Sequence, residues 1–174
     1  MPSRRHDEIV AVARRLLESE GRAGLTMRAI AAELGIQAPS LYKHIADKHE
    51  LEVALIADGF TESAEAFETA AAGSDDSVVA IAAVYRAWAL DHPHLYRMMT
   101  GEPLARSELP QGVEDRAAAP LIAAVDGDRD RARALWAFAH GMVALELAHR
   151  FPHDADVTAA WSAGLNGFTT GAPQ

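Results

Sequence analysis

The sequence predicts an all-α protein. Apolar residues recur three or four positions apart, the spacing of one face of a helix, through most of the 174 residues. Glycines and prolines separate these stretches at positions where helices stop or start. Hydrophobic residues make up 49% of the chain, which is enough apolar surface for the core of one or two compact units.

The first expected helix covers residues 4–20. Ile9, Val12 and Leu16 lie on an apolar stripe along it. Gly21 follows directly and is expected to end the helix. We expect the apolar face of this helix to pack beneath the next two helices.

The second expected helix is short and begins after Thr26, whose side chain can cap the first free N–H groups. Met27, Ile30 and Leu34 mark its apolar face. Gly35 comes next. Because glycine adopts the left-handed conformation that ends many helices at little cost, we expect the helix to stop there.

The third expected helix covers residues 39–45 and begins at Pro39, whose missing N–H and fixed φ suit a first turn. Leu41 and Ile45 would be its buried residues. Two short helices joined by a turn that contains glycine form a helix-turn-helix, which places its second helix in the DNA major groove. The sequence therefore predicts a DNA-binding motif.

The outward side chains of this motif suit contacts with DNA. Gln37 and Ser40 can hydrogen-bond to base edges, and Pro39 can touch a thymine methyl group. A cation in the first turn of a helix, such as Lys48, is disfavoured by the helix dipole but can bind a phosphate. Other residues nearby offer hydroxyl, cationic and imidazole groups that can bind phosphates. The predicted DNA contacts are Thr26, Arg28, Gln37, Ala38, Pro39, Ser40, Tyr42, Lys43, His44 and Lys48.

At these residues the chain resembles a known family. The run GLTMRAIAAELGIQAPSLYKHIADKHELEVAL, residues 24–55, resembles the DNA-binding region of the tetracycline-repressor (TetR) family. That pattern is a Thr-led helix, a Gly turn, an SLYxH recognition helix and a DKxxL entry to a long helix. The alternative is an αα-hairpin without a nucleic-acid role, because the motif is informative only through its assembled spacing.

A long helix is expected to start at Lys48 and to end near Gly73, with Asp47 and Glu50 as its cap and reciprocal partner. It would link two units. We therefore expect a three-helix DNA-binding domain over residues 1–47 and a helical ligand-binding and dimerisation domain over residues 48–174.

Several further helices are expected in the second domain. Residues 78–91 are apolar nearly all round, which is typical of a central helix. Pro120 should interrupt the helix over residues 113–125, and Pro152 should end the one over residues 128–149. The remaining expected helices cover residues 95–99 and 156–168, and residues 101–112 form a loop.

The last two helices are more apolar than a single chain of this length can bury, which suggests a homodimer interface built as a four-helix bundle. Trp136, His140 and Gly141 form a Trp-x-x-x-His-Gly pattern that resembles a C-terminal subgroup of the same family. The resemblance implies a dimeric repressor whose second domain holds a small-molecule pocket.

Large, adaptable side chains can line such a pocket, and a His or Tyr can orient the ligand. Residues of these types are more often part of an ordinary core. The residues nominated on this basis are Phe60, Tyr85, Trp88, Met99, Trp136 and His140.

The net charge of −9 is unevenly distributed along the chain. Residues 1–50 carry eight Lys or Arg and seven Asp or Glu, a net of +1, whereas residues 51–174 carry eight and eighteen, a net of −10. A nearly neutral DNA-binding domain implies modest non-specific affinity. Tight binding would then need a dimer and a defined site.

A metal-responsive regulator or metal-binding helical protein is the alternative of a different class. Imidazole and carboxylate ligands could come from His92, His94, His140, His149 and His153 with Glu146. Their spacing argues against a shared site, because His140 and His149 are nine positions apart and do not lie on the same helix face. Neither a catalytic motif nor a phosphate-binding loop is present, so we expect no enzyme activity and no cofactor.

The sequence has no cysteine, and its longest apolar run, residues 78–85, is too short to span a bilayer. We therefore expect a cytoplasmic protein without a membrane partner. The combined expectation is a homodimeric repressor that binds a palindromic operator in double-stranded DNA and is released by a small, largely apolar effector.

Overall fold

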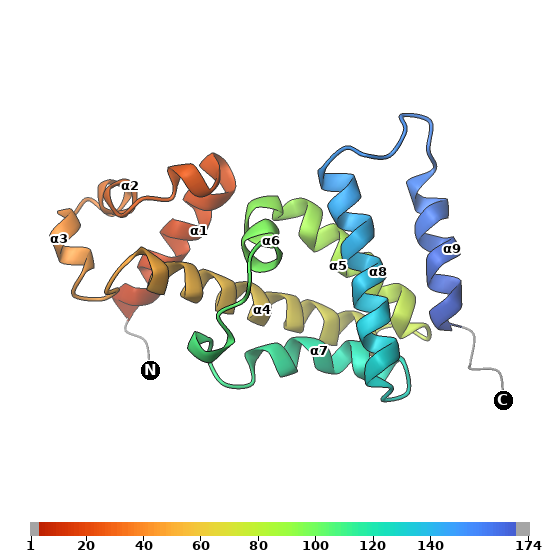
Figure 1. Cartoon of the computed structure of the whole chain (residues 1–174). Helices are drawn as coiled ribbons and strands as arrows, with labels where there is room; N and C mark the ends of the chain where they lie inside the picture. Colours follow the sequence, from red (N-terminus) through yellow and green to blue (C-terminus); the bar gives the residue numbers. More distant parts are fainter. Residues whose placement is uncertain (1–3, 170–174) are drawn as a thin grey trace. The chain divides into compact units, whose positions relative to one another are not determined.

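The computed structural model describes residues 4–169, and every regular element in this range is helical (Figure 1). The all-α prediction is confirmed. The elements are α1 (Arg4–Gly24), α2 (Met27–Glu33), α3 (Ala38–Leu41), α4 (Lys48–Ala72), α5 (Ser77–Asp91), α6 (Pro93–Thr100), the short 3₁₀ helix η1 (Arg106–Glu108), α7 (Val113–Ala124), α8 (Arg129–Leu147) and α9 (Val157–Thr169).

The described residues form two compact units. The first contains the chain up to Phe60 together with His92–Gln111, and the second contains Thr61–Asp91 and the chain from Gly112 onward. Helix α4 contributes its first half to one unit and its second half to the other. The domain boundary expected between residues 47 and 48 divides the chain by function and not by packing. It stays a prediction.

In the first unit, α1 does not end at Gly21 as expected. The chain bends there, with φ of 70° at Gly21, and then continues helically to Gly24. A Cβ atom at Gly21 would lie 3.2 Å from Cε1 of His94, so glycine also makes room for α6. The glycine therefore bends the helix and allows a close approach instead of ending it.

The N-terminus of α6 is capped by a residue from α1. The carboxylate of Glu18 accepts hydrogen bonds from the backbone N–H groups of His94 at 3.2 Å and Leu95 at 2.9 Å. Both groups are among the N–H donors that a helix start leaves unpaired. A Cβ atom at Gly59 would lie 2.8 Å from Cδ2 of Leu95, so α4 also packs closely against α6.

Helix α2 begins after Thr26 as predicted, whereas α3 begins at Ala38, one residue before the predicted start at Pro39. Thr26 Oγ1 accepts a hydrogen bond from the N–H of Ala29 at 3.1 Å, and Gly35 has a left-handed φ of 66°. Helix α3 is shorter than predicted, because the N–H groups of His44 and Ile45 both donate to the carbonyl of Leu41. Sharing one carbonyl tightens the chain into a turn, which ends the regular helix at Leu41.

The core of the first unit consists of aliphatic side chains from α1, α2, α3, α4 and α6. Leu41 and Ile45, the predicted buried residues of the third helix, are 0% and 1% exposed. The other large, fully buried side chains are those of Ile9, Leu17, Leu25, Ile30, Leu51, Leu55 and Leu95.

Helix α4 starts at Lys48 with the expected cap. Asp47 Oδ1 accepts from the N–H of Glu50 at 2.8 Å, whereas the carboxylate of Glu50 accepts from the N–H of Ala46 at 2.5 Å. In a standard capping box, the Glu carboxylate accepts from the N–H of the N-cap residue, here Asp47. In this helix it accepts from the N–H of the residue before it. The helix ends at Ala72, next to the expected stop at Gly73.

In the second unit, α5 contacts α7, α8 and α9, in agreement with its predicted central place. Ile81 and Ala89 are buried, but Val79 is 44% and Leu90 37% exposed, so one side of α5 is open in the single chain. A half-buried polar cluster joins three of the helices. In it, Glu146 of α8 accepts from Arg86 of α5 at 2.7 Å and from Trp161 of α9 at 2.7 Å.

Two predicted helix boundaries in the second unit were wrong. Helix α7 runs through Pro120 without interruption, because one lost hydrogen bond is tolerated where Pro120 and Leu121 are buried. Helix α8 ends at Leu147, well before Pro152. His149 has a φ of 52°, and the N–H groups of His149 and Arg150 donate to Glu146 and Leu145, which is a Schellman ending.

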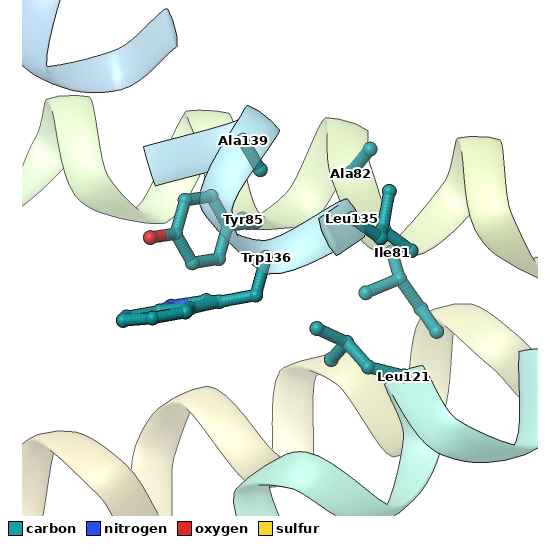
Figure 2. Close-up of a pocket in the computed structure, with 7 residues that line it drawn as sticks. All are labelled: Ile81, Ala82, Tyr85, Leu121, Leu135, Trp136 and Ala139. Atoms are coloured by element: carbon teal, nitrogen blue, oxygen red, sulfur yellow. The ribbon is translucent and has the colours of Figure 1, made fainter. Parts of the chain in front are cut away.

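The second unit encloses a small apolar cavity between α5, α7 and α8 (Figure 2). It offers room for about one water molecule. Figure 2 shows the indole of Trp136 next to the ring of Tyr85. The cavity is lined by Ile81, Ala82, Tyr85, Leu121, Leu135, Trp136 and Ala139.

Between residues 4 and 169, none of the helices combines the length and the apolar character needed to cross a membrane.

Candidate nucleic-acid interface

The surface formed by α2, the turn at Gly35 and α3 carries the predicted DNA contacts. Eight of the ten predicted residues are exposed, and the other two, Ala38 and Ser40, are half-buried. Tyr42 is 53% exposed, which is unusual for so large a side chain. None of the predicted contact residues is therefore hidden in the core of the first unit.

The polar groups of this surface are largely free of protein partners. Within residues 4–169, no other protein group pairs with the side chains of Arg28, Gln37 and Lys43. Binding DNA would therefore not require these side chains to break contacts within the protein. Thr26 differs, since its hydroxyl oxygen already caps α2, which leaves its hydroxyl proton for a phosphate oxygen.

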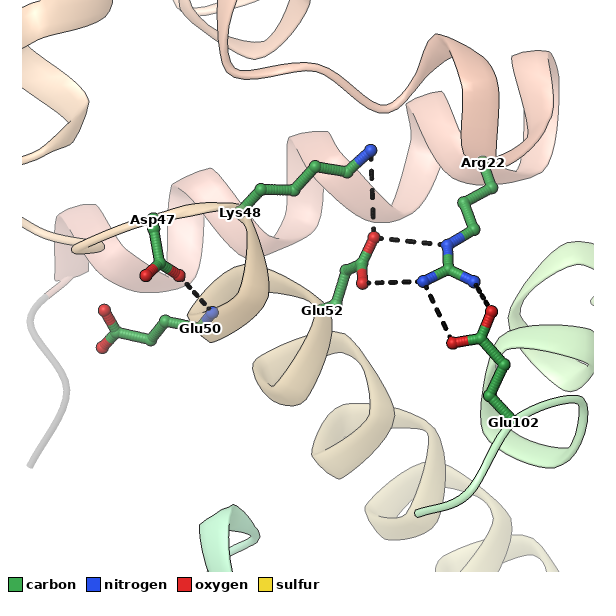
Figure 3. A network of polar contacts seen from close by, with 6 residues as sticks. All are labelled: Arg22, Asp47, Lys48, Glu50, Glu52 and Glu102. Atoms are coloured by element: carbon green, nitrogen blue, oxygen red, sulfur yellow. Dashed lines mark hydrogen bonds and ion pairs between the residues drawn. The ribbon is translucent and has the colours of Figure 1, made fainter. Parts of the chain in front are cut away.

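Lys48 lies at the edge of this surface in the first turn of α4. Its Nζ atom is 3.8 Å from the Glu52 carboxylate one helical turn later. Glu52 also accepts hydrogen bonds from the guanidinium of Arg22, at the end of α1, at 3.1 and 3.4 Å. The same guanidinium donates at 2.6 Å to Glu102, which follows α6 (Figure 3).

A second contact joins the start of α4 to the segment between α6 and α7. Nε2 of His49 is 2.6 Å from a carboxylate oxygen of Glu108 in η1. The hydrogen bond and the charge of Glu108 raise the pKa of His49 above its ordinary value. The first two residues of α4 therefore each lie beside a carboxylate.

The sequence analysis missed Arg22, Glu52 and Glu102. The i, i+4 spacing of Lys48 and Glu52 is a readable signal for a helical ion pair. Arg22 and Glu102 are eighty positions apart, and no local pattern predicts that they meet.

The residues nominated for a ligand pocket are only partly brought together. Tyr85 and Trp136 line the cavity of the second unit, and the ring of His140 stacks on Trp136 at a centroid distance of 5.8 Å. Trp88 instead donates a hydrogen bond to Glu62 at 3.0 Å. Phe60 and Met99 belong to the first unit. The cavity residues Ile81, Ala82, Leu121, Leu135 and Ala139 were not nominated, because short aliphatic residues carry no signal that distinguishes a pocket from a core.

Among the described residues, no three His, Asp or Glu side chains lie close enough together to hold a metal ion. No observation on these residues supports the metal-binding alternative.

Comparison with known proteins identifies both parts of the chain. Residues 9–55 match the family described as bacterial regulatory proteins of the tetR family. Residues 78–168 match the family described as the tetracyclin repressor-like C-terminal domain. The second match alone covers more than half of the 174 residues.

Individual relatives agree with these matches. An uncharacterised HTH-type transcriptional regulator of Mycobacterium tuberculosis is 34% identical over 151 residues, which are 81% of this chain and 69% of that protein. The crystal structure of a regulatory protein superposes with a TM-score of 0.74 at 27% identity, over 97% of this chain and 98% of that one. A multidrug-binding protein complexed with imidazole superposes with a TM-score of 0.67 at 25% identity, over 98% of both chains.

Proposed function

This chain belongs to the tetracycline-repressor family of DNA-binding transcriptional regulators, and we propose that it is a homodimeric repressor released from a palindromic operator by a small, largely apolar effector. The relatives are regulators and not enzymes. The observation that carries the proposal is the exposed helix-turn-helix surface, on which none of the ten predicted DNA contacts is buried.

The assignment of contacts follows from the chemistry of each side chain. Gln37, at the N-terminal end of α3, has a free amide that can bind a base edge in the major groove. Tyr42, Lys43, His44 and Lys48 follow α3 and begin α4, where hydroxyl, imidazole and ammonium groups can bind phosphates. The first contact would select a sequence, and the others would supply affinity for any duplex.

The proposed dimer interface lies on the outer faces of α8 and α9. A Cβ atom at Gly141 of α8 or Gly167 of α9 would meet no atom within 4 Å, so both faces are open in the single chain. Small residues allow helices to approach closely, and here they recur at helical spacing. They are Ala137, Gly141 and Ala144 on α8 with Ala148 at its C-cap, and Ala159, Ala163 and Gly167 on α9.

An exposed apolar side chain on α8 supports the same proposal. Leu145, next to Ala144 of this face, is 44% exposed, whereas Trp136 lies nine positions earlier, on the opposite side of the helix. A second copy that pairs its own α8 and α9 with this surface would form a four-helix bundle and cover apolar area. A two-fold dimer then presents two helix-turn-helix surfaces, which is the reason to expect a palindromic operator.

The effector is proposed to enter the cavity beside Tyr85 and Trp136. Its lining is entirely apolar or aromatic, which favours an apolar ligand. The cavity is too small for a ligand as it stands, so the partly exposed indole of Trp136 would have to move. The similar multidrug-binding protein is itself complexed with a small molecule, which supports a ligand-responsive role.

Selection of binding sites from a random duplex library tests this proposal. The purified chain should enrich one palindromic sequence and bind it as two copies per duplex, as measured by analytical ultracentrifugation. If the enriched DNA has no two-fold symmetry, or if one copy binds per site, the homodimeric repressor is excluded. Enrichment of no sequence at all would remove the sequence-specific function.

A further inference from the structure

We propose that Glu102 is a positioning residue that weakens DNA binding. Its carboxylate holds the guanidinium of Arg22, so Glu52 needs the ammonium of Lys48 to compensate its negative charge. This inference rests on the proposed function of Lys48 as a phosphate contact. It assigns a role in DNA binding to a residue outside the helix-turn-helix, in the segment that follows α6.

The four side chains form one connected cluster within the first unit (Figure 3). Lys48 is 3.8 Å from Glu52, Glu52 accepts from Arg22 at 3.1 Å, and Arg22 donates to Glu102 at 2.6 Å. Arg22 is thus shared between two carboxylates. The hydrogen bonds that Arg22 donates to both carboxylates, the one to Glu102 foremost, raise the pKa of the guanidinium, which is charged in any case.

The charges explain why the sharing matters. Two cations and two carboxylates give the intact cluster a net charge of zero. When a phosphate takes Lys48 away, Arg22 is left with both carboxylates, and the cluster carries −1 beside an incoming anion. Glu52 is the least exposed of these groups, at 15%, so its charge is screened least by solvent.

Neutralising Glu102 reverses this effect. Arg22 and Glu52, which already share two hydrogen bonds, then form a net-neutral pair without help from Lys48. The ammonium becomes available to a phosphate, and no net negative charge remains behind it. Because the side chains of Arg22 and Glu102 are 49% and 65% exposed, we expect a modest gain, about two- to fivefold in affinity.

The test compares the affinities of Glu102→Gln and wild type for a fluorescein-labelled duplex of random sequence, measured by fluorescence anisotropy at fixed salt. Glu20→Gln is the matched control, because it removes the same charge from an exposed position near the end of α1. Glu102→Asp should restore the wild-type affinity. Circular dichroism verifies that each variant is folded.

The decisive step repeats Glu102→Gln in a Lys48→Met background. We expect the gain to disappear there, because Glu102 acts only through Lys48. An equal gain in both backgrounds, or an equal gain from Glu20→Gln, would show a general charge effect and overturn the inference. No gain in the wild-type background would also overturn it. If the wild-type chain does not bind the duplex at all, the proposed function fails instead.

Discussion

His49 Nε2 lies 2.6 Å from a carboxylate oxygen of Glu108, and this contact joins the first turn of α4 to the 3₁₀ helix between α6 and α7. The hydrogen bond and charge of Glu108 raise the pKa of His49, and Asp47 and Glu52 act in the same direction. The pair therefore favours the protonated, cationic histidine in the folded chain.

The contact has a defined pH dependence. Below the ordinary pKa of about 6.5, His49 is charged in the folded and unfolded chains, and the contribution of the pair to stability is fully present. As pH rises through the raised pKa of the folded chain, the contribution is lost. Nuclear magnetic resonance titration should place the midpoint of His49 above 6.5. In Glu108→Gln the midpoint should fall, and an unchanged midpoint would show that Glu108 is not the cause.

The second prediction separates affinity from sequence preference. Lys48→Ala should weaken binding to all duplexes alike and lower the slope of log affinity against log salt by roughly one, because one phosphate contact is lost. Gln37→Ala should cost about 1–3 kcal/mol on the preferred site and relax its sequence preference. Salt-dependent anisotropy on two duplexes measures both. Equal loss of discrimination in the two variants would contradict this division of roles.

The third prediction concerns the cap that α1 provides for α6. Glu18→Ala removes the acceptor of the His94 and Leu95 N–H groups, so it should lower the free energy of unfolding by about 1–2 kcal/mol. Urea denaturation measures this change. The exposed Glu20→Ala on the same helix is the control and should change stability by less than about 0.5 kcal/mol. Equal effects of the two substitutions would mean that the cap does not stabilise the fold.

Local chemistry explains which parts of the fold could be predicted. The Thr26 cap, the left-handed Gly35 and the cap of α4 at Asp47 depend on residues three or four positions apart, so the sequence shows them directly. The length of α3 could not be read in the same way, because the sharing of the Leu41 carbonyl is a detail of backbone geometry. The interruption predicted at Pro120 does not occur, because burial of Pro120 in the fold outweighs its local cost.

Contacts between distant segments explain what was missed. Glu18 meets α6 across seventy-six positions, and Arg22 meets Glu102 across eighty. Neither pair has a local pattern, since a charged residue near the end of a helix is usually solvated. The six aromatic, Met and His residues nominated for a pocket show the same limit. Only Tyr85 and Trp136 line the cavity, because residue type alone does not say which way a side chain points.

The fourth prediction tests the dimer surface. Gly141→Arg adds a long cation to an open face of α8, so the single chain should still fold but should no longer pair. Sedimentation velocity should show a monomer, and affinity for a palindromic site should fall to that for random DNA. Ala118→Arg places the same charge on an exposed position of α7 and should remain dimeric. A dimer in Gly141→Arg would exclude this face as the interface.

The fifth measurement is the most direct test of the central claim, that two copies of this chain read one palindromic DNA site. Hydroxyl-radical footprinting on the site selected from random DNA should show two equivalent protected regions related by two-fold symmetry. Their centres should be about 34–36 Å apart, one turn of the double helix, or a multiple of that distance. A single protected region, or two regions without this symmetry, would contradict the account.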